Sequence, residues 1–403
     1  MLWSKLPRQL KILLTSMIFA NIGTRMYRPF LPLYILSLGG TVEQVGILFT
    51  LDTIVEAVMR PIGGWISDSI GRLQAVAIGT LWGLLASIGY ALAPSWGWLV
   101  LVLVLLTAGR SLVGPSFRAY TAEAAPEGQT AQTFGLVNGI FTVCQVIGPL
   151  IGGWMVTEFG MKAMFWGAAG FMLLATIMRQ WAAWGLVYRW ETVKFAGLTT
   201  NLRGMSAGML AGGAMTWLIF TDGVADFGVN VYENLRSIFL ENNGLTEAQI
   251  GYLFSFHAVV YLLVSLFGSK LADRWPVGAL ALGRGIHAAG LFMLAVAPSI
   301  PVFILYFALD ALAFGLGDPA FDMMLVKAAP KGSLGMTFGL LSTTVGLFAM
   351  PAPYLGGLLW ERLAPTTPFW VGAVALGLAG MAAWGILGVR LGMNGKIRET
   401  VEV

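Results

Sequence analysis

The chain has little charge, little histidine and a single cysteine. Charged residues make up only 11% of its 403 residues, whereas 57% are hydrophobic. This balance excludes a soluble protein, because the polar groups are too few to cover a folded chain of this size. The lone Cys144 excludes an intramolecular disulfide and a cysteine-rich metal site, and two histidines leave little room for a histidine metal cluster.

The sequence also lacks the motifs of two other protein classes. It contains no GxxxxGK[ST] loop, so direct coupling to ATP has no support. It contains no nucleophile motif, no His/Cys/Glu cluster and no sizeable soluble domain, which weighs against a membrane enzyme and against a receptor. We therefore expect no enzymatic activity, no cofactor, no bound metal and no nucleic-acid partner.

Long apolar stretches dominate what is present. Each can cross about 30 Å of hydrocarbon as a helix of roughly 20 residues. The stretches are continuous, unlike the alternating strands of about ten residues in a membrane β-barrel. The sequence predicts an all-α polytopic membrane protein with twelve transmembrane helices, near residues 12–37, 43–66, 74–93, 97–122, 132–157, 162–185, 205–233, 247–270, 278–297, 300–326, 335–360 and 366–391.

Basic residues concentrate in alternate loops, which indicates the orientation of the chain. With both termini cytoplasmic, the inner segments hold most of them, including Arg179 and Arg284, and the outer loops hold only Lys162, Arg236 and Arg362. We expect a multi-pass protein of the plasma membrane whose first span is retained. Five further basic residues fall inside predicted helices and need another explanation, namely Arg25, Arg28, Arg60, Arg110 and Arg118.

The two halves of the chain repeat each other. At an offset of 204 residues, the TFGL sequence at 133–136 matches the TFGL at 337–340, and the glycine pair at 152–153 matches the pair at 356–357. Further upstream the offset is 205 residues. A parallel repeat of this length predicts an N-terminal six-helix bundle over 1–190, a cytoplasmic linker over 191–204 and a C-terminal six-helix bundle over 205–403. Thr41 with Gln44, and Thr246 with Gln249, each predict a capping box that opens a helix.

Three local motifs stand out. Between the second and third predicted helices, the segment GWISDSIGR contains Gly64, Asp68, Gly71 and Arg72. Here Gly64 would permit close helix contact, Asp68 would lie at a helix end near a basic partner, and Arg72 would anchor the loop at the lipid headgroups. The fourth helix carries Arg110 followed by Gly114, and the fifth carries a GPxxGG sequence formed by Gly148, Pro149, Gly152 and Gly153.

With these motifs the chain resembles the major facilitator superfamily along essentially its whole length. The GPxxGG sequence is similar to the signature of its twelve-helix drug:proton antiporter branch. The resemblance implies two bundles that rock around a central site, with the motif residues active in gating. An alternative for GPxxGG is a kinked, closely packed helix without a coupling role. Many drug exporters of the family carry an acid in the first helix, where this chain has Arg25 and Arg28.

Ionisable side chains inside the membrane cost at least about 2.5–3.5 kcal/mol on insertion scales, so they usually line a cavity or pair. On the first helix, Asn21, Arg25 and Arg28 share one face and can line a single cavity wall. These arginines favour an anionic or zwitterionic group unless partners neutralise them. The full set of candidate substrate-binding residues is Asn21, Arg25, Arg28, Tyr27, Asn138, Gln145 and Tyr232.

Acids concentrate on the seventh and tenth helices. Asp222, Asp226 and Asp310 are the best-placed proton-coupling groups, with Arg110 as the accompanying cation and Glu56 and Asp52 next in rank. A static salt bridge is the alternative for each acid, and an intrahelical pair with Arg60 is the alternative for the stripe on the second helix. The two histidines, His257 and His287, are expected to be packed and neutral. Because Arg118 and Asp322 occupy equivalent positions in the two halves, we expect them to form a gate pair at the cytoplasmic mouth.

The function that these observations favour is secondary active transport by alternating access. We expect a monomer in the lipid bilayer that exports small amphipathic compounds or drugs against entering protons. Two alternatives on the same fold are a proton symporter that imports a small anionic metabolite and a lipid or lysolipid flippase. The direction in which a pH gradient drives flux discriminates export from import.

Overall fold

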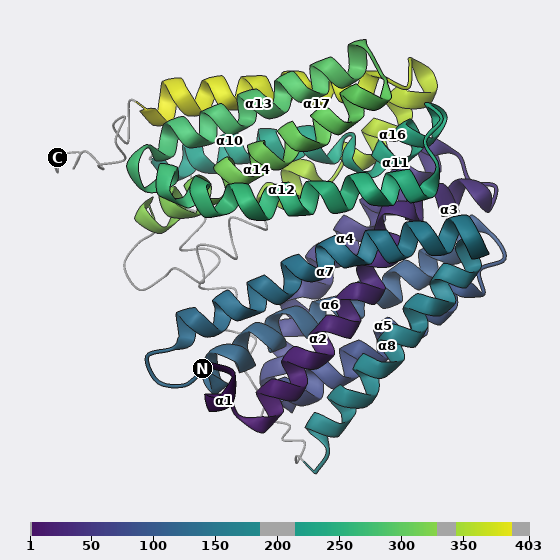
Figure 1. Cartoon of the computed structure of the whole chain (residues 1–403), viewed down its shortest axis with the longest axis vertical. Helices are drawn as coiled ribbons and strands as arrows, with labels where there is room; N and C mark the ends of the chain where they lie inside the picture. Colours follow the sequence, from purple (N-terminus) through teal and green to yellow (C-terminus); the bar gives the residue numbers. More distant parts are fainter. Residues whose placement is uncertain (1, 186–213, 329–343, 389–403) are drawn as a thin grey trace. The chain divides into compact units, whose positions relative to one another are not determined.

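The computed structural model describes residues 2–185, 214–328 and 344–388 (Figure 1). Every regular element within these ranges is helical, which confirms the predicted all-α class. The predicted linker at 191–204 lies outside the described residues, as do the second TFGL sequence at 337–340 and the first part of the seventh predicted helix. The boundaries of the two predicted bundles stay a prediction.

The helices of the chain pack into two compact units. The first comprises Met1–Thr41, Leu51–Val193 and Gly244–Ser255, and the second comprises Val42–Thr50, Lys194–Asn243 and Phe256–Val403. In chain order the elements up to residue 183 are α1 (Leu2–Lys5), α2 (Arg8–Tyr27), η1 (Arg28–Phe30), α3 (Leu31–Ser37), α4 (Val42–Ile70), α5 (Arg72–Ala91), α6 (Trp96–Ala124), α7 (Thr130–Phe159) and α8 (Met161–Ala183). Those from residue 214 onward are α10 (Ala214–Asn230), η2 (Glu233–Leu235), α11 (Arg236–Asn242), α12 (Glu247–Arg274), α13 (Pro276–Val296), α14 (Ile300–Ala328), α16 (Ala352–Arg362), α17 (Thr367–Ala382) and η3 (Ala383–Leu387).

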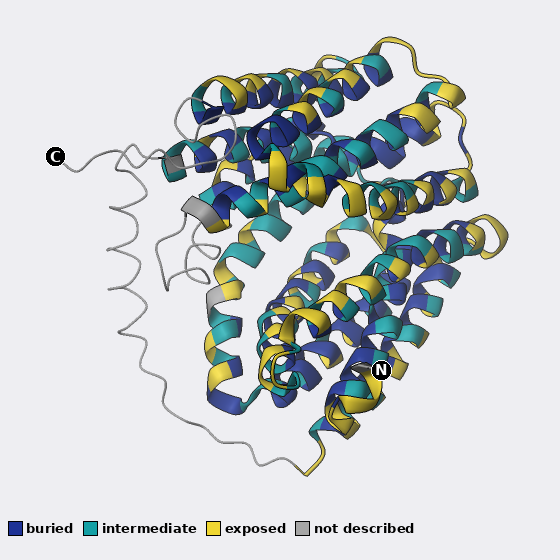
Figure 2. Cartoon of the chain, turned by 60° about the vertical axis from the view of Figure 1, so that its left-hand side comes forward, coloured by how far each residue is buried: buried dark blue, intermediate teal, exposed yellow. Residues whose placement is uncertain are grey.

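The helix surfaces are those of a membrane protein. Among the described residues, eight helices are long and apolar enough to cross a bilayer, namely α5 to α8, α12 to α14, and α17 continued by η3. Large apolar side chains remain exposed on many of them, for example Leu101 (65%), Trp154 (53%) and Phe267 (69%). Figure 2 shows exposed residues along helices of both units. So much exposed apolar surface is unfavourable in water, whereas it is compatible with the hydrocarbon of a lipid bilayer. The predicted polytopic character is confirmed.

The internal repeat is visible in the packing of each unit. In the first unit α5 packs against α6 and α8, and α2 packs against α8 and α7. In the second unit α13 packs against α14 and α17, and α10 packs against α17. A close contact also repeats, because Gly79 of α5 faces the carbonyl of Gly109 and, 204 residues later, Gly283 of α13 faces the carbonyl of Ala313. The sequence repeat therefore corresponds to a repeated helix arrangement.

The start of α12 shows how one predicted local signal is realised. The backbone N–H of Thr246 donates to the side-chain oxygen of Gln249 at 2.9 Å, and the N–H of Gln249 donates to the Thr246 hydroxyl at 3.3 Å. These two reciprocal bonds satisfy backbone donors that the first turn of a helix leaves without partners. The capping box predicted at this position is confirmed.

Candidate functional site

The first unit contains a cavity of about 430 Å³ that is rich in arginine. We call it the N-terminal cavity. Helices α2, α5, α6, α7 and α8 and the start of η1 supply its wall. Its lining residues are Ala20, Asn21, Thr24, Arg25, Arg28, Gly79, Thr80, Gly83, Leu106, Arg110, Val113, Gly114, Arg118, Phe141, Met172 and Arg179. Five of these are arginines, and none is an acid.

The face of α2 that the sequence singled out forms one side of this cavity. Asn21, Arg25 and Arg28 all line it, as their helical spacing predicts. The guanidinium of Arg25 lies 4.8 Å from the ring centre of Phe141, and the amide of Asn21 donates to the Met17 carbonyl at 2.8 Å. Their role in substrate binding stays a prediction, but their common position is a property of the structure.

The GPxxGG segment of α7 determines how closely α2 can approach. A methyl group at Gly148 would clash with Arg25, and one at Gly152 would clash with the carbonyl of Met26. The repeat shows the same contact in the second unit, where Gly356 meets the carbonyl of Val231. The glycines therefore bring the backbone of α2 against α7 at the position of Arg25. This packing role is present whether or not the segment also acts in coupling.

The sequence does not predict one charged residue of the N-terminal cavity, Arg179. The positive-inside pattern predicts a cytoplasmic position for Arg179, yet its side chain is buried, with 5% of the residue exposed. Its Nε donates to the Ser16 hydroxyl at 2.9 Å and its Nη1 donates to the Thr80 hydroxyl at 2.7 Å. The two hydroxyls fix the guanidinium but carry no negative charge. A signal was available, since Arg179 lies within the predicted sixth helix.

Arg110 belongs to a charge network with α4. Its guanidinium lies 3.2 Å from Asp52 and 2.8 Å from Glu56. Glu56 also contacts Arg60 at 2.5 Å, and Asp52 accepts a hydrogen bond from the Thr107 hydroxyl. The prediction that Arg110 accompanies the acids of the seventh and tenth helices differs from this arrangement, because its carboxylate partners lie within its own unit.

Several other predicted binding residues do not line the N-terminal cavity. Tyr27 is buried among the rings of Tyr90 and Phe165, each with its centre 5.4 Å away, and packs as part of the core. Asn138 and Gln145 lie on α7 but are not part of the wall. Tyr232 belongs to the second unit, where it is fully buried and its hydroxyl lies 2.5 Å from Nε2 of His287.

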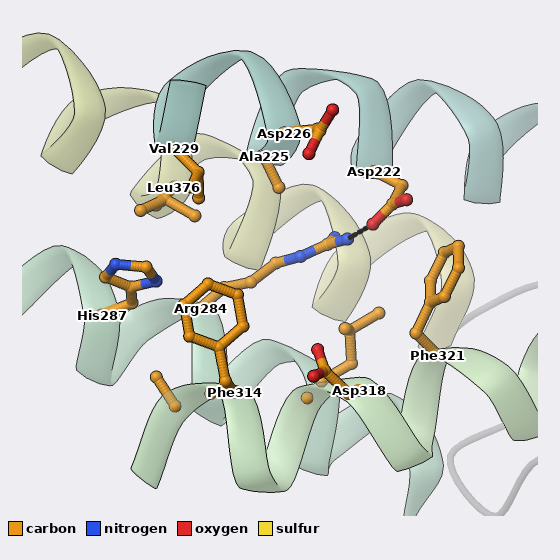
Figure 3. Close-up of a pocket in the computed structure, with 14 residues that line it drawn as sticks. Asp222, Ala225, Asp226, Val229, Arg284, His287, Phe314, Asp318, Phe321 and Leu376 are labelled. Atoms are coloured by element: carbon orange, nitrogen blue, oxygen red, sulfur yellow. Dashed lines mark hydrogen bonds and ion pairs between the residues drawn. The ribbon is translucent and has the colours of Figure 1, made fainter. Parts of the chain in front are cut away.

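The second unit contains an acidic counterpart, a cavity of about 230 Å³ that we call the C-terminal cavity. Figure 3 shows Arg284 reaching across it towards Asp222, with Asp226 and Asp318 nearby. Arg284 lies 3.0 Å from Asp222. Asp318 accepts a hydrogen bond from the Tyr261 hydroxyl at 3.2 Å. Asp226 makes an ion pair with none of the residues that the structure describes.

A buried charge cluster lies beside this cavity. The side chain of Asp310 is fully buried and lies 2.7 Å from Nη1 of Arg236, 2.9 Å from Nε2 of His287 and 3.2 Å from Nε2 of His257. His287 also lines the C-terminal cavity, so it connects the cluster to that space. Arg236 and Asp310 can both be buried because each charge has the opposite charge beside it, which offsets the cost of removing it from water.

The sequence placed Arg236 in an outer loop and Arg284 in an inner one. Both are in fact helical and buried, with 9% and 6% of each residue exposed, and each pairs with a predicted proton-coupling acid. The positive-inside pattern predicts loop positions for both residues wrongly, because hydropathy fixes loop boundaries only to within several residues. The histidines were expected to be packed, and their packing against Asp310 could not be read from the sequence.

The two cavities occupy equivalent positions in the repeat. With the offset of 205 residues on α2 and 204 beyond it, ten lining positions of one cavity correspond to lining positions of the other. Their polar content differs. The N-terminal residues Asn21, Thr80, Gly83, Arg110 and Gly114 correspond to Asp226, Arg284, His287, Phe314 and Asp318.

The loop motif lies away from both cavities. Arg72 contacts Asp68 and lies 3.3 Å from Glu123, so it joins the end of α4 to the end of α6. Gly71 has a φ of 105°, which favours glycine at the turn between α4 and α5. The close contact predicted for Gly64 is wrong, because a methyl group there would meet open space.

The neighbouring Gly63 is the residue that meets α6, at the carbonyl of Ser111.

The residues of the predicted gate pair belong to different units. Arg118 lines the N-terminal cavity, and Asp322 is exposed in the second unit. Their pairing stays a prediction.

Comparisons with known proteins agree with the fold. The chain is 24% identical over 382 residues to multidrug resistance protein 1 of Bacillus subtilis, covering 93% of this chain and 96% of that protein. It is 20% identical over 352 residues to an uncharacterized MFS-type transporter of Methanocaldococcus jannaschii, covering 85% and 89%. A crystal structure of the peptide transporter POT in complex with sulfate superposes with a TM-score of 0.75 at 16% identity, covering 96% of both chains, which shows the fold.

The sequence profile of the Major Facilitator Superfamily matches residues 13–212 and again residues 202–400. These two matches span nearly the whole chain and coincide with the internal repeat. The resemblance inferred from the motifs is thereby confirmed, and the chain belongs to the Major Facilitator Superfamily of membrane transporters.

Proposed function

We propose that this transporter is a proton-coupled antiporter that exports small amphipathic compounds by alternating access. The observation that carries the proposal is the acidic C-terminal cavity with its adjoining cluster, in which Asp222 pairs with Arg284 and Asp310 pairs with Arg236. Ionisable groups inside a membrane bundle are costly, and they typically mark ion or proton pathways. The names of related proteins, multidrug resistance protein 1 and quinolone resistance protein NorA of Staphylococcus aureus, favour export of drug-like compounds.

Protonation would have different effects on the Asp222–Arg284 pair and on the Asp310–Arg236 pair. Protonation of Asp222 removes the charge that holds Arg284, so the Arg284 side chain is released within the cavity. Asp226, one turn along α10, can exchange its charge for a proton without breaking an ion pair to a described residue. Asp310 is held by Arg236 and is also in contact with the imidazoles of His257 and His287. Coupling would then consist of proton binding that changes which ion pairs are intact.

The experiment that tests the proposal measures flux in proteoliposomes under pH gradients of both signs. The probes are ethidium as an amphipathic cation and 8-anilinonaphthalene-1-sulfonate as an amphipathic anion. Antiport predicts that a transported probe accumulates when the lumen is acidic, because protons leave as the probe enters. Uptake driven by an acidic exterior would overturn the proposal in favour of the symporter alternative.

Variants assign the coupling to residues. We expect Asp222→Asn and Asp226→Asn to abolish the dependence of flux on the gradient. The matched control is Glu127→Gln, which removes an exposed carboxylate from the loop between α6 and α7. If both aspartate variants retain full gradient dependence, these residues are not the coupling groups.

The location and assembly state are parts of the same proposal. We propose the plasma membrane, cytoplasmic termini and a monomer as the working unit, without a cofactor and with the proton gradient as the energy source. The flippase alternative is supported by the arginines of the N-terminal cavity, and it predicts movement of a lysolipid between leaflets without a requirement for a pH gradient.

A further inference from the structure

The N-terminal cavity combines strong positive charge with an apolar wall. Five arginines line it, and the lining includes no carboxylate. The arginines come from α2, the start of η1, α6 and α8, so they converge on one space from separate elements. Such convergence of cations in a concave site is the arrangement by which proteins bind anions.

The lining residue Arg110 is neutralised by carboxylates of the protein itself. Arg110 contacts both Asp52 and Glu56, and Glu56 also contacts Arg60. This group contains two acids and two arginines, so its formal charges cancel. The excess positive charge of the cavity therefore resides on other lining arginines, among them Arg28, Arg118 and Arg179.

Arg28, Arg118 and Arg179 have no carboxylate partner among the described residues. Arg179 is buried and is fixed by the hydroxyls of Ser16 and Thr80. Arg28 and Arg118 make no ion pair with any residue of 2–185, 214–328 and 344–388. An anion bound between these side chains would supply the missing negative charge.

The remaining wall is apolar. Leu106 and Val113 of α6, Phe141 of α7 and Met172 of α8 line the same space. A ligand that complements both the arginines and the apolar side chains of the wall has an anionic group and an apolar body. The volume of about 430 Å³ suits a small molecule or one headgroup with part of a chain.

We infer that the N-terminal cavity is a binding site for the anionic group, a carboxylate or a phosphate, of an amphipathic substrate. The inference deepens the proposed function, on which it rests, by naming the charge class of the transported compound. Arg25, Arg28 and Arg179 are the residues that contact the anion. The equivalent cavity of the second unit is lined instead by Asp222, Asp226 and Asp318 beside Arg284.

The test is equilibrium binding to the purified full-length protein in neutral detergent, without a pH gradient. The probes are decyl phosphate, decanoate, inorganic phosphate, lysophosphatidylglycerol and the cation decyltrimethylammonium. Binding of decyl phosphate or decanoate, weakened by added salt, is the expected result. Tighter binding of decyltrimethylammonium than of both anions overturns the inference.

Variants assign the binding to the cavity. We expect Arg28→Gln and Arg25→Gln each to weaken decyl phosphate about tenfold, since each removes a charge-assisted bond. Arg28 is exposed, so its replacement does not endanger folding as the replacement of buried Arg179 would. The matched control is Arg8→Gln on the same helix, whose guanidinium stacks on Trp181 outside the cavity, and it should bind as the wild type does. Wild-type affinity in both cavity variants overturns the inference.

The probes also separate the sources of the anion. Binding of lysophosphatidylglycerol that exceeds that of decyl phosphate supports a lipid headgroup, whereas binding of inorganic phosphate at comparable affinity supports a free solute. The two proposals fail separately. Anion binding without gradient-driven flux refutes proton antiport and leaves this inference standing, and gradient-driven flux of ethidium without anion binding refutes this inference and leaves antiport standing.

Discussion

The N-terminal and C-terminal cavities are equivalent positions of one repeat, yet they carry opposite charge. Arginines dominate the first, whereas Asp222, Asp226 and Asp318 line the second. The helix contacts around them are the same in kind, as the packing of Gly79 on Gly109 and of Gly283 on Ala313 shows. The repeat thus preserves the positions at which helices touch, while the side chains that face the cavities differ freely in charge.

The two units also compensate buried cations differently. Among the residues described in the second unit, both buried arginines have a carboxylate partner, Asp222 for Arg284 and Asp310 for Arg236. In the first unit the buried Arg179 is held by two hydroxyls. The difference teaches that the second unit compensates its buried cations with carboxylates, which the proposed function uses for proton exchange, whereas the first unit leaves Arg179 to two hydroxyls and so, by the inference above, to an external anion.

The largest effect should come from breaking an internal pair. Asp310→Asn leaves the buried Arg236 with only the more distant Glu233, at 3.8 Å, as a carboxylate partner, and breaking a buried pair costs about 3–5 kcal/mol of stability. We expect a large loss of monodisperse protein in detergent and a thermal midpoint lowered by several degrees. The double variant Asp310→Asn with Arg236→Gln should recover part of the loss, because it removes the charge left behind. A wild-type midpoint in the single variant would show that the pair contributes little.

A second prediction tests the shared packing. Gly148→Ala forces a methyl group against Arg25, and overpacking of this kind costs about 1–3 kcal/mol. The measurement is again thermal unfolding in detergent, together with the affinity for decyl phosphate, which should fall because α2 is displaced. Gly135→Ala on the same helix is the control, since a methyl group there meets open space. Equal midpoints for the two variants would contradict the close approach of α2 and α7.

A third prediction makes one cavity resemble the other. Asn21 occupies the position of Asp226, so Asn21→Asp places a carboxylate one turn from Arg25 within the arginine-rich lining. We expect the affinity for decyl phosphate to fall about tenfold, or about 1.4 kcal/mol, with little change in stability. Asparagine and aspartate have nearly the same shape, so this substitution changes the charge alone and needs no separate control for shape. An unchanged affinity for decyl phosphate would mean that charge at this position is irrelevant to binding.

The fold was predictable from the sequence because apolar length, the repeat and the GPxxGG sequence are all local or periodic signals. The face of α2 with Asn21, Arg25 and Arg28 was predictable for the same reason, since helical spacing alone places them together. The partners of the acids were not. Whether Arg236 and Arg284 lie in a loop or in a helix depends on where a span ends, and the contact of Asp310 with two histidines depends on tertiary packing that no spacing encodes.

The smallest expected effect separates two uses of glycine within α6. Gly109 faces the backbone of α5, whereas Gly114 lines the N-terminal cavity and has open space where a methyl group would lie. Gly114→Ala should therefore be neutral or stabilise the protein by up to about 0.5–1 kcal/mol, because alanine favours the helix interior over glycine. Gly109→Ala should destabilise it. Thermal unfolding of the two variants checks the sign of each change. A destabilised Gly114→Ala would mean that the position equivalent to Asp318 is closed by packing, and that the N-terminal cavity is smaller than its lining implies.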